Sequence, residues 1–157
     1  MSDHQNDQQV DYKHILVATD FSDEAVLVGE RAKDIARRYG ARLSLVHVVE
    51  EVNISAGYEL MPLLPELPDE ALLNEARDSL NRLGEKLELS DAQKWAISAV
   101  STKEGILRTA QEQQADLIVV GSHGRHGLSL LLGSTANAVL HGAPCDVLAV
   151  RIHSHEG

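Results

Sequence analysis

Short apolar runs alternate with segments of helical periodicity along this chain, and that alternation is the main signal of its fold. Five runs rich in Val, Ile, Leu and Ala have the length of strands: Lys13–Thr19, Arg42–Val49, Lys94–Val100, Ala115–Val120 and Cys145–Arg151. The stretches ILVA and LIVV within the first and fourth runs are apolar without interruption, which is typical of strands buried on both faces. The runs therefore predict a central, mostly parallel sheet.

Four helices are predicted between these strands. The first follows Ser22, which we expect to be its N-cap, and it ends at Gly40, because apolar residues recur at a spacing of three and four between them. The other helices are expected at 69–87, at 104–113 and from Ser134 to the helix-breaking residues at 142–144. This order favours an α/β fold, an open, mostly parallel, five-stranded doubly wound sheet with helices on both faces.

The 157 residues suit one domain, which we place at 11–152 between flexible tails at 1–10 and 153–157. One connection departs from the regular pattern. Residues 50–68 contain one glycine and three prolines, and this length exceeds that of an ordinary loop. We interpret the segment as an irregular excursion that serves as a lid or as a partner surface.

Composition narrows the class of protein. Hydrophobic residues make up 43% and charged residues 24%, as in a soluble globular domain, while aromatic residues make up only 3%, so the core must be aliphatic. The formal net charge of -10 repels the phosphates of nucleic acids and anionic membranes, and we expect neither as a partner. The single cysteine, Cys145, is expected to be an inert buried thiol, and with the polar N-terminus it favours a cytoplasmic location.

A glycine-rich segment follows the fourth strand directly. Five of the 11 glycines lie between positions 121 and 142, and Gly133-Ser134-Thr135 opens the last helix. Glycines at a strand end let backbone N–H groups approach a ligand closely, and a helix N-terminus adds unpaired donors and partial positive charge. The segment therefore suits a phosphate group, although it matches neither the P-loop nor the dinucleotide fingerprint.

The distribution of charge supports an anion site in the same place. Residues 117–145 contain no Asp or Glu, where the average of the chain would give about four, although buried strand and helix account for part of this shortage. Arg125 is the charged residue of this stretch and a candidate phosphate contact, unless it is simply a solvated loop residue. The segment is thus the local exception that an anion would need in an acidic protein.

Asp20 is the second candidate for ligand chemistry. It lies just past the carboxyl end of the first strand, where open α/β sheets bind ligands at the crevice between diverging strands. If the first and fourth strands are neighbours, Asp20 faces the glycine segment, where it could accept a hydrogen bond from a ribose hydroxyl or lie next to a Mg ion. The alternative is a structural role, in which its carboxylate satisfies backbone donors in the turn.

The motifs ATDFS at 18–22, LVHV at 45–48, ADLIVVGSHGRHG at 115–127 and CDVLAV at 145–150 together resemble the universal stress protein family. The resemblance covers about Tyr12 to Ile152 and implies a Rossmann-like fold of the adenine nucleotide alpha-hydrolase type. Many members bind ATP through Gly-x2-Gly-x9-Gly-Ser/Thr. Gly121, Gly124 and Gly133-Ser134 match this pattern here, but eight residues separate Gly124 from Gly133 where the pattern has nine.

The resemblance also implies a set of nucleotide-binding residues and an assembly. Around adenine and ribose it places Ala18, Thr19, Asp20 and Val48, and around the phosphates Gly121, His123, Gly124, Gly133, Ser134 and Thr135. The implied ligand is ATP or a related adenine nucleotide, with Mg as a candidate companion, bound as a regulatory ligand. Family members form homodimers through the last strand, and we expect the same here.

Other functions are weighed against this one. His123 and His126 lack a nearby Cys or carboxylate and make a poor metal site, and Ser134 lacks the nucleophile elbow of a hydrolytic triad. Two alternatives to a nucleotide-binding regulator remain open. One is a dimeric interaction module of the same fold without nucleotide, and the other is a slow ATPase that uses Asp20 to position a metal ion or water.

Overall fold

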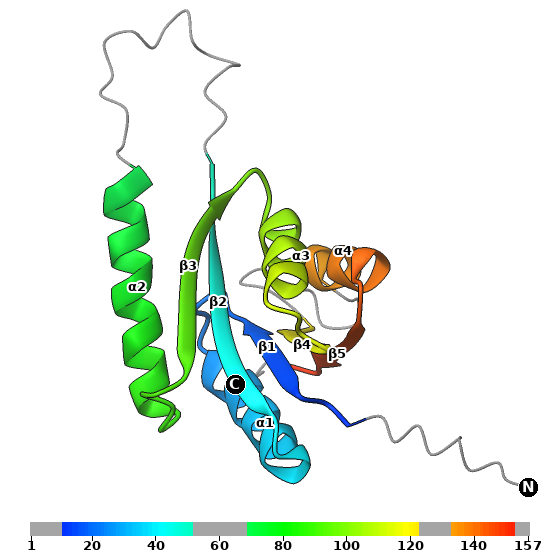
Figure 1. Cartoon of the computed structure of the whole chain (residues 1–157). Coiled ribbons are helices and arrows are strands. Elements are labelled where there is room, and N and C mark those ends of the chain that lie inside the picture. The colour runs from blue at the N-terminus through cyan, green and yellow to red at the C-terminus, as the bar shows by residue number, and fades with distance from the viewer. Residues whose placement is uncertain (1–10, 52–68, 123–132, 153–157) are drawn as a thin grey trace, which may run out of the picture.

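The structure is a computed structural model that describes residues 11–51, 69–122 and 133–152. In this part of the chain strands and helices alternate without exception (Figure 1). The strands are β1 (His14–Ala18), β2 (Arg42–Glu50), β3 (Gln93–Ala99), β4 (Leu117–Gly121) and β5 (Asp146–Val150), and the helices are α1 (Ala25–Tyr39), α2 (Asp69–Lys86), α3 (Thr102–Glu112) and α4 (Ser134–Gly142). The predicted order of elements is confirmed, and the predicted bounds differ from these by a few residues at most.

The five strands form one parallel sheet in the order β3-β2-β1-β4-β5. β1 lies at its centre and pairs with β2 on one side and with β4 on the other, so that Val17 is opposite both Leu45 and Val119. The chain thus leaves β1 toward one edge of the sheet and later returns to build the other edge. This reversal makes the carboxyl ends of β1 and β4 the point where an open α/β sheet forms a ligand crevice.

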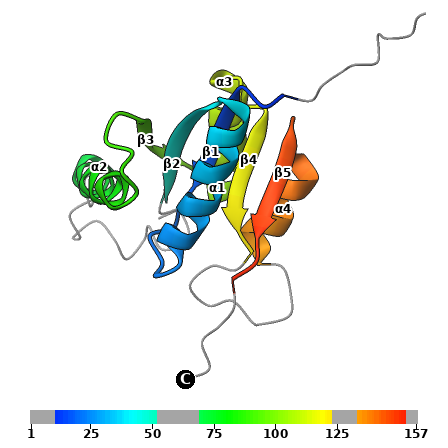
Figure 2. The ribbon, with the colours of Figure 1, turned by 90° about the horizontal axis from the view of Figure 1, so that it is seen from below.

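Helices cover both faces of the sheet (Figures 1 and 2). Ile15 and Val17 of β1 pack with buried residues of α1 and α2 in one apolar cluster. Leu16, between them, packs with buried residues of α3 and α4 in the other cluster. Because successive side chains of a strand point to opposite faces, an unbroken apolar run supplies both layers of the core.

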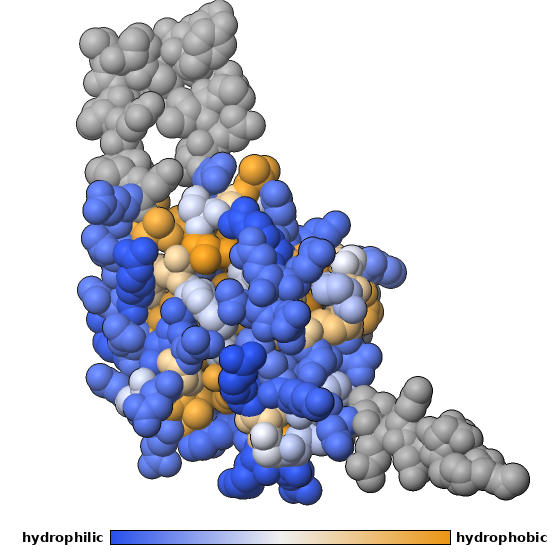
Figure 3. Space-filling model, in the orientation of Figure 1, coloured by the Kyte–Doolittle hydropathy of each residue, from blue (hydrophilic) through white to orange (hydrophobic). Residues whose placement is uncertain are grey.

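The core is aliphatic, as the composition predicts. Among the described residues the largest fully buried side chains are Ile, Leu and Val, with His14 as the exception. The face drawn in Figure 3 is mainly hydrophilic, with hydrophobic residues scattered among the polar ones. Cys145 precedes β5 and is only partly buried, not fully buried as expected. Burial, together with Asp116 and Asp146, raises the pKa of its thiol.

The start of α1 differs from the prediction. The helix begins at Ala25, and Ser22 is not its N-cap, because Glu24 holds that position without a side-chain cap hydrogen bond. Ser22 belongs instead to the preceding turn, where its N–H donates to Asp20 Oδ1 over 2.9 Å and its carbonyl accepts from the Ala25 N–H over 3.0 Å. The end is as predicted, since Gly40 is the C-cap with φ 67°, a left-handed conformation that glycine adopts without strain.

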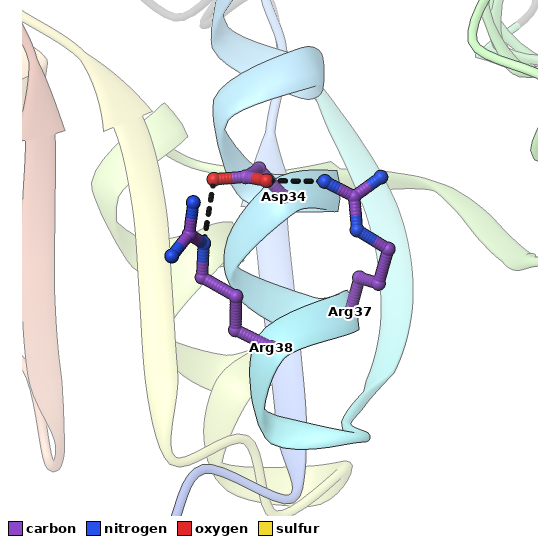
Figure 4. A network of polar contacts seen from close by, with 3 residues as sticks. All are labelled: Asp34, Arg37 and Arg38. Carbon is purple, nitrogen blue, oxygen red and sulfur yellow. Dashed lines mark hydrogen bonds and ion pairs between the residues drawn. The ribbon is translucent and has the colours of Figure 1, made fainter.

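The solvent side of α1 carries a small ionic network (Figure 4). Asp34 pairs with Arg37 one turn later and with Arg38, whose Nε lies 3.0 Å from Asp34 Oδ2. The hydrogen bond from Arg38 is the main cause that lowers the pKa of the Asp34 carboxyl. These pairs place a carboxylate before cations along the helix, which is the favourable order for the helix dipole.

The start of α3 also differs from the prediction, by two residues. The helix begins at Thr102, and Ser101 is its N-cap, because the Ser101 hydroxyl accepts from the Glu104 N–H over 3.1 Å. Upstream, β2 continues to Glu50, so the predicted excursion loses its first residue to the sheet. Residue 51 follows without regular structure, and residues 52–68 of that excursion and the two predicted tails lie outside the described residues.

Candidate functional site

A pocket of about 170 Å³ lies at the carboxyl end of the sheet, at the reversal between β1 and β4. Its lining combines strand ends, the turn after β1 and the amino ends of three helices, α1, α3 and α4. The lining residues are Val17, Ala18, Thr19, Asp20, Ser22, Ala25, Val28, Val46, Val48, Thr102, Ile106, Val120, Gly121, Gly133, Ser134, Thr135, Ala136 and Ile152. Asp20 is the one charged residue in this described lining, and no aromatic residue belongs to it.

The amino end of α4 supplies hydrogen-bond donors to this pocket. Gly133 is the N-cap in an extended conformation, no side chain of the described residues caps the helix, and its first turn contains no acidic residue. The first N–H groups of a helix have no partner within the helix, and the helix dipole adds partial positive charge there. Since Gly133, Ser134 and Thr135 line the pocket, this end is suited to an anionic group.

Ser122 holds Gly133 in place, and it is not among the predicted site residues. Its carbonyl accepts from the Gly133 N–H over 2.6 Å, while its own N–H donates to the Val150 carbonyl over 2.8 Å. Its hydroxyl accepts from the Ile152 N–H over 3.0 Å, and the residue is buried. Ser122 therefore joins the end of β4 to β5 and to the start of α4, and so fixes where that helix begins.

The turn after β1 forms another part of the wall. The Phe21 N–H donates to the hydroxyl of Thr19 over 3.1 Å, and the Ser22 N–H donates to Asp20 Oδ1 over 2.9 Å. Asp20 therefore has the structural role that the sequence left open as an alternative, through one of its two oxygens. The hydroxyl hydrogen of Thr19 remains available as a donor, because Thr19 uses only its oxygen as acceptor in this bond.

Helix α3 also reaches the pocket, which was not predicted. Thr102 and Ile106 line it, but the amino end of α3 is occupied by an internal anion, because Glu50 Oε2 accepts from both the N–H and the hydroxyl of Thr102. The pattern Ser-x-x-Glu at 101–104 is the sequence signal that would have placed this helix start correctly. The amino end of α4, by contrast, has no acidic residue in its first turn and a glycine as its N-cap.

The structure brings most of the predicted residues together. Ala18, Thr19, Asp20, Val48, Gly121, Gly133, Ser134 and Thr135 all line the pocket. His123, Gly124 and Arg125 lie outside the described residues. The apolar walls are aliphatic, with Val46 and Val48 from β2 and Ile106 from α3, so a flat ring bound here would contact methyl groups and backbone.

Two further features bear on the chemistry of the site. In the described ranges no three His, Cys, Asp or Glu residues are grouped so that they could hold a metal ion. Nor does that part of the chain contain a helix with the length and apolar character of a membrane span.

Comparisons with known proteins all point to one family. The family model described as the universal stress protein family matches residues 11–151. Universal stress protein A homolog 1 of Coxiella burnetii is 41% identical over 140 residues, which are 88% of this chain and 96% of the relative.

Two solved structures support the same relationship. The universal stress protein UspA from Lactobacillus plantarum is 30% identical with a TM-score of 0.68, over 89% of this chain and 98% of that one. A universal stress protein in complex with cAMP is 27% identical with a TM-score of 0.57, over 88% and 96% of the two chains. With its doubly wound sheet and its match over nearly the whole length, the chain belongs to the universal stress protein family.

Proposed function

We propose that this protein binds ATP or a related adenine nucleotide as a regulatory ligand in the pocket between β1 and β4, with little or no turnover. The observation that carries the proposal is the amino end of α4, which no described side chain caps and which lines the same pocket as Asp20. A similar protein of the same family is described in complex with cAMP, which also contains an adenine ring and a phosphate.

We assign the phosphates and the nucleoside of the ligand to different groups of pocket residues. Ser134 and Thr135 offer backbone and hydroxyl donors to the phosphates, while Gly121 and Gly133 leave room for the phosphates to approach the backbone. His123, Gly124 and Arg125 are proposed for the same group from the sequence. Asp20 accepts from a ribose hydroxyl through the oxygen that does not hold the Ser22 N–H, or lies next to a Mg ion bound with the phosphates. The adenine ring then rests on aliphatic side chains, among them Val48.

We also propose a cytoplasmic homodimer that pairs through β5. This strand is at one edge of the sheet, and edge strands that meet across a two-fold axis satisfy each other's open backbone groups. Sedimentation equilibrium of the full chain would test this, with a mass of twice 17.1 kDa as the expected result and a monomer as the contrary one.

Isothermal titration calorimetry with ATP, with and without Mg, tests the nucleotide proposal. Saturable binding at one site per chain is expected, and no saturable heat at millimolar ATP would overturn the proposal in favour of an interaction module of the same fold. Release of phosphate measured on the same samples separates a regulatory site from a slow ATPase.

Paired glycine variants locate the site. Gly133→Val crowds the start of α4, and it should abolish binding while the circular dichroism spectrum stays that of the native protein. The control is Gly40→Val, which strains a left-handed residue at the opposite end of the sheet and should leave the affinity unchanged. Equal affinity of the two variants would count against α4 as the phosphate site.

A further inference from the structure

Phe21, one residue beyond Asp20, has an unusual backbone. Its φ is 60°, in the left-handed region that residues with a Cβ seldom adopt. Such a conformation persists only where surrounding contacts hold it, and functional sites are among the places where it clusters. Neither Phe21 nor His47, whose ring packs against it, lines the pocket, so this part of the support for the turn comes from residues outside the pocket lining.

His47 provides two of those contacts. Its Nδ1 lies 2.7 Å from the carbonyl oxygen of Thr19. A carbonyl only accepts, so Nδ1 carries the proton and donates it. The imidazole also packs against the ring of Phe21, with centroids 4.3 Å apart and planes tilted by 33°.

The sheet explains why a side chain is needed at this position. The pairing of β1 with β2 ends at Ala18 and Val46, and the Thr19 N–H adds one more bond, to the Val46 carbonyl over 3.0 Å. Beyond that point the chain after β1 turns away from β2, and the imidazole of His47 donates a hydrogen bond to the Thr19 carbonyl. Both backbone groups of Thr19 are thus fixed by β2, immediately before the residue whose carboxylate enters the pocket.

We propose that His47 is a positioning residue for the ligand site, which acts through the turn Thr19–Ser22 and not by touching the ligand. Val46 and Val48 line the pocket from β2, and His47 lies between them with its side chain on the opposite face, because side chains alternate along a strand. The imidazole fixes Thr19 and supports Phe21, and these two residues set the direction of the Asp20 carboxylate.

The expected effect of His47 on ligand affinity rests on the proposed nucleotide function. Its effect on the turn can be measured without ligand. The variants are His47→Leu, which keeps the bulk and removes the donor, and His47→Asn, whose amide N–H can replace Nδ1–H. Ser44→Ala is the matched control, because it removes a buried hydrogen bond to His14 near the other end of β2 and leaves the turn intact.

NMR of the ligand-free full chain gives the first readout. The coupling between the amide proton and Hα of Phe21 reports its φ, and the amide shifts of Phe21 and Ser22 report their bonds to Thr19 and Asp20. We expect His47→Leu to change all three, and His47→Asn and Ser44→Ala to retain the native values. Native values in His47→Leu would overturn the proposal, whether or not the protein binds nucleotide.

Calorimetry with ATP and Mg gives the second readout. His47→Leu should weaken binding by about tenfold, while His47→Asn should stay within about threefold of the unmodified protein, since loss of one oriented hydrogen bond is typically of this size. Absence of binding in the unmodified protein would refute the nucleotide function and not the role in the turn. If His47→Leu does not fold, Phe21→Leu replaces it and should show the same loss, and native affinity and native turn signals in that variant would overturn the proposal.

Discussion

One carboxylate oxygen of Glu50, at the end of β2, holds the first residue of α3: Oε2 lies 2.8 Å from the backbone nitrogen of Thr102 and 2.9 Å from its hydroxyl oxygen. An anion at the amino end of a helix satisfies an unpaired N–H and interacts favourably with the helix dipole. Because Thr102 lines the pocket, this pair also fixes one wall of the candidate site.

Removal of that anion should destabilise the protein. Glu50→Ala is expected to lower the free energy of unfolding by about 1 kcal/mol, the usual cost of losing a helix cap. Urea unfolding followed by circular dichroism measures it. Glu51→Ala is the matched control, since it removes the same charge one residue later, where the nearest hydrogen bond, from Ser98, is 3.5 Å long. Equal losses in the two variants would show that net charge, not capping, is responsible.

Gly105 allows α3 to pack closely on β2. A Cβ at this position would lie 2.6 Å and 2.8 Å from the two γ carbons of Val48. Gly105→Ala should therefore cost about 1–2 kcal/mol, because overpacking outweighs the gain in helix propensity. In urea unfolding, adding Val48→Ala should relieve the clash, so that the double variant loses less stability than the sum of the two single changes.

The control for that experiment is another glycine in a helix. At Gly84 the closest atom to an added Cβ would be Cε of Lys94, at the far end of a flexible side chain, and the Leu89 carbonyl oxygen would lie 3.3 Å away. Gly84→Ala should therefore change stability by no more than about 0.5 kcal/mol or increase it. A large loss there, or additive losses at Gly105 and Val48, would contradict the packing explanation.

His14 should make the protein less stable in mild acid. It is 2% exposed, with Nδ1 2.9 Å from the Gln113 carbonyl and Nε2 2.7 Å from Ser44 Oγ. Burial is the main cause that lowers the pKa of His14 below 6.5, and the positive charge of Arg42 acts in the same direction. As the pH falls below about 6.5, the unfolded chain therefore binds a proton that the folded protein resists, and stability decreases.

The test compares the pH dependence of two proteins. His14→Asn does not titrate, so its free energy of unfolding should fall less steeply between pH 7.5 and 5 than that of the unmodified protein. The difference in slope should not exceed about 1.4 kcal/mol per pH unit, the limit for one proton. Because both proteins share the other seven of the eight histidines, parallel curves would contradict this role of His14.

Ser122 should contribute to stability through its buried hydroxyl. Ser122→Ala leaves the Ile152 N–H without the acceptor that it has in the native structure, which should cost about 1–2 kcal/mol. The control is Ser79→Ala, where the hydroxyl only accepts from Arg82 in an exposed pair, and there a change below about 0.5 kcal/mol is expected. Thermal unfolding measures the melting temperature of both variants, and equal melting temperatures would contradict the prediction.

The regular elements and half of the pocket could be predicted from local pattern alone. The strands ILVA and LIVV appear as unbroken apolar runs because each is covered on both faces, and the glycines after LIVV mark a close approach of backbone. Asp20 and Gly133 could be assigned to one site because parallel strands deliver their following residues to the same edge of the sheet.

Other features depend on contacts between residues distant in sequence, for which local pattern carries no signal. Serine is a residue type that often caps helices, which is why the sequence predicts Ser22 as the N-cap. In the structure Ser22 belongs to a turn with Asp20, and α1 begins only at Ala25. Ser122 and His47 look like ordinary strand residues, and their roles become visible only with Ile152 and Thr19 in place.

The amino-acid sequence by itself thus determined the order of strands and helices, the aliphatic core and the acid-free glycine segment, because these follow from periodicity and composition within short windows. Only the tertiary structure decided which backbone groups remain open at the pocket. That outcome depends on the reversal between β1 and β4 and on which carboxylates reach which helix ends, with Glu50 at α3 and no described acidic residue at α4.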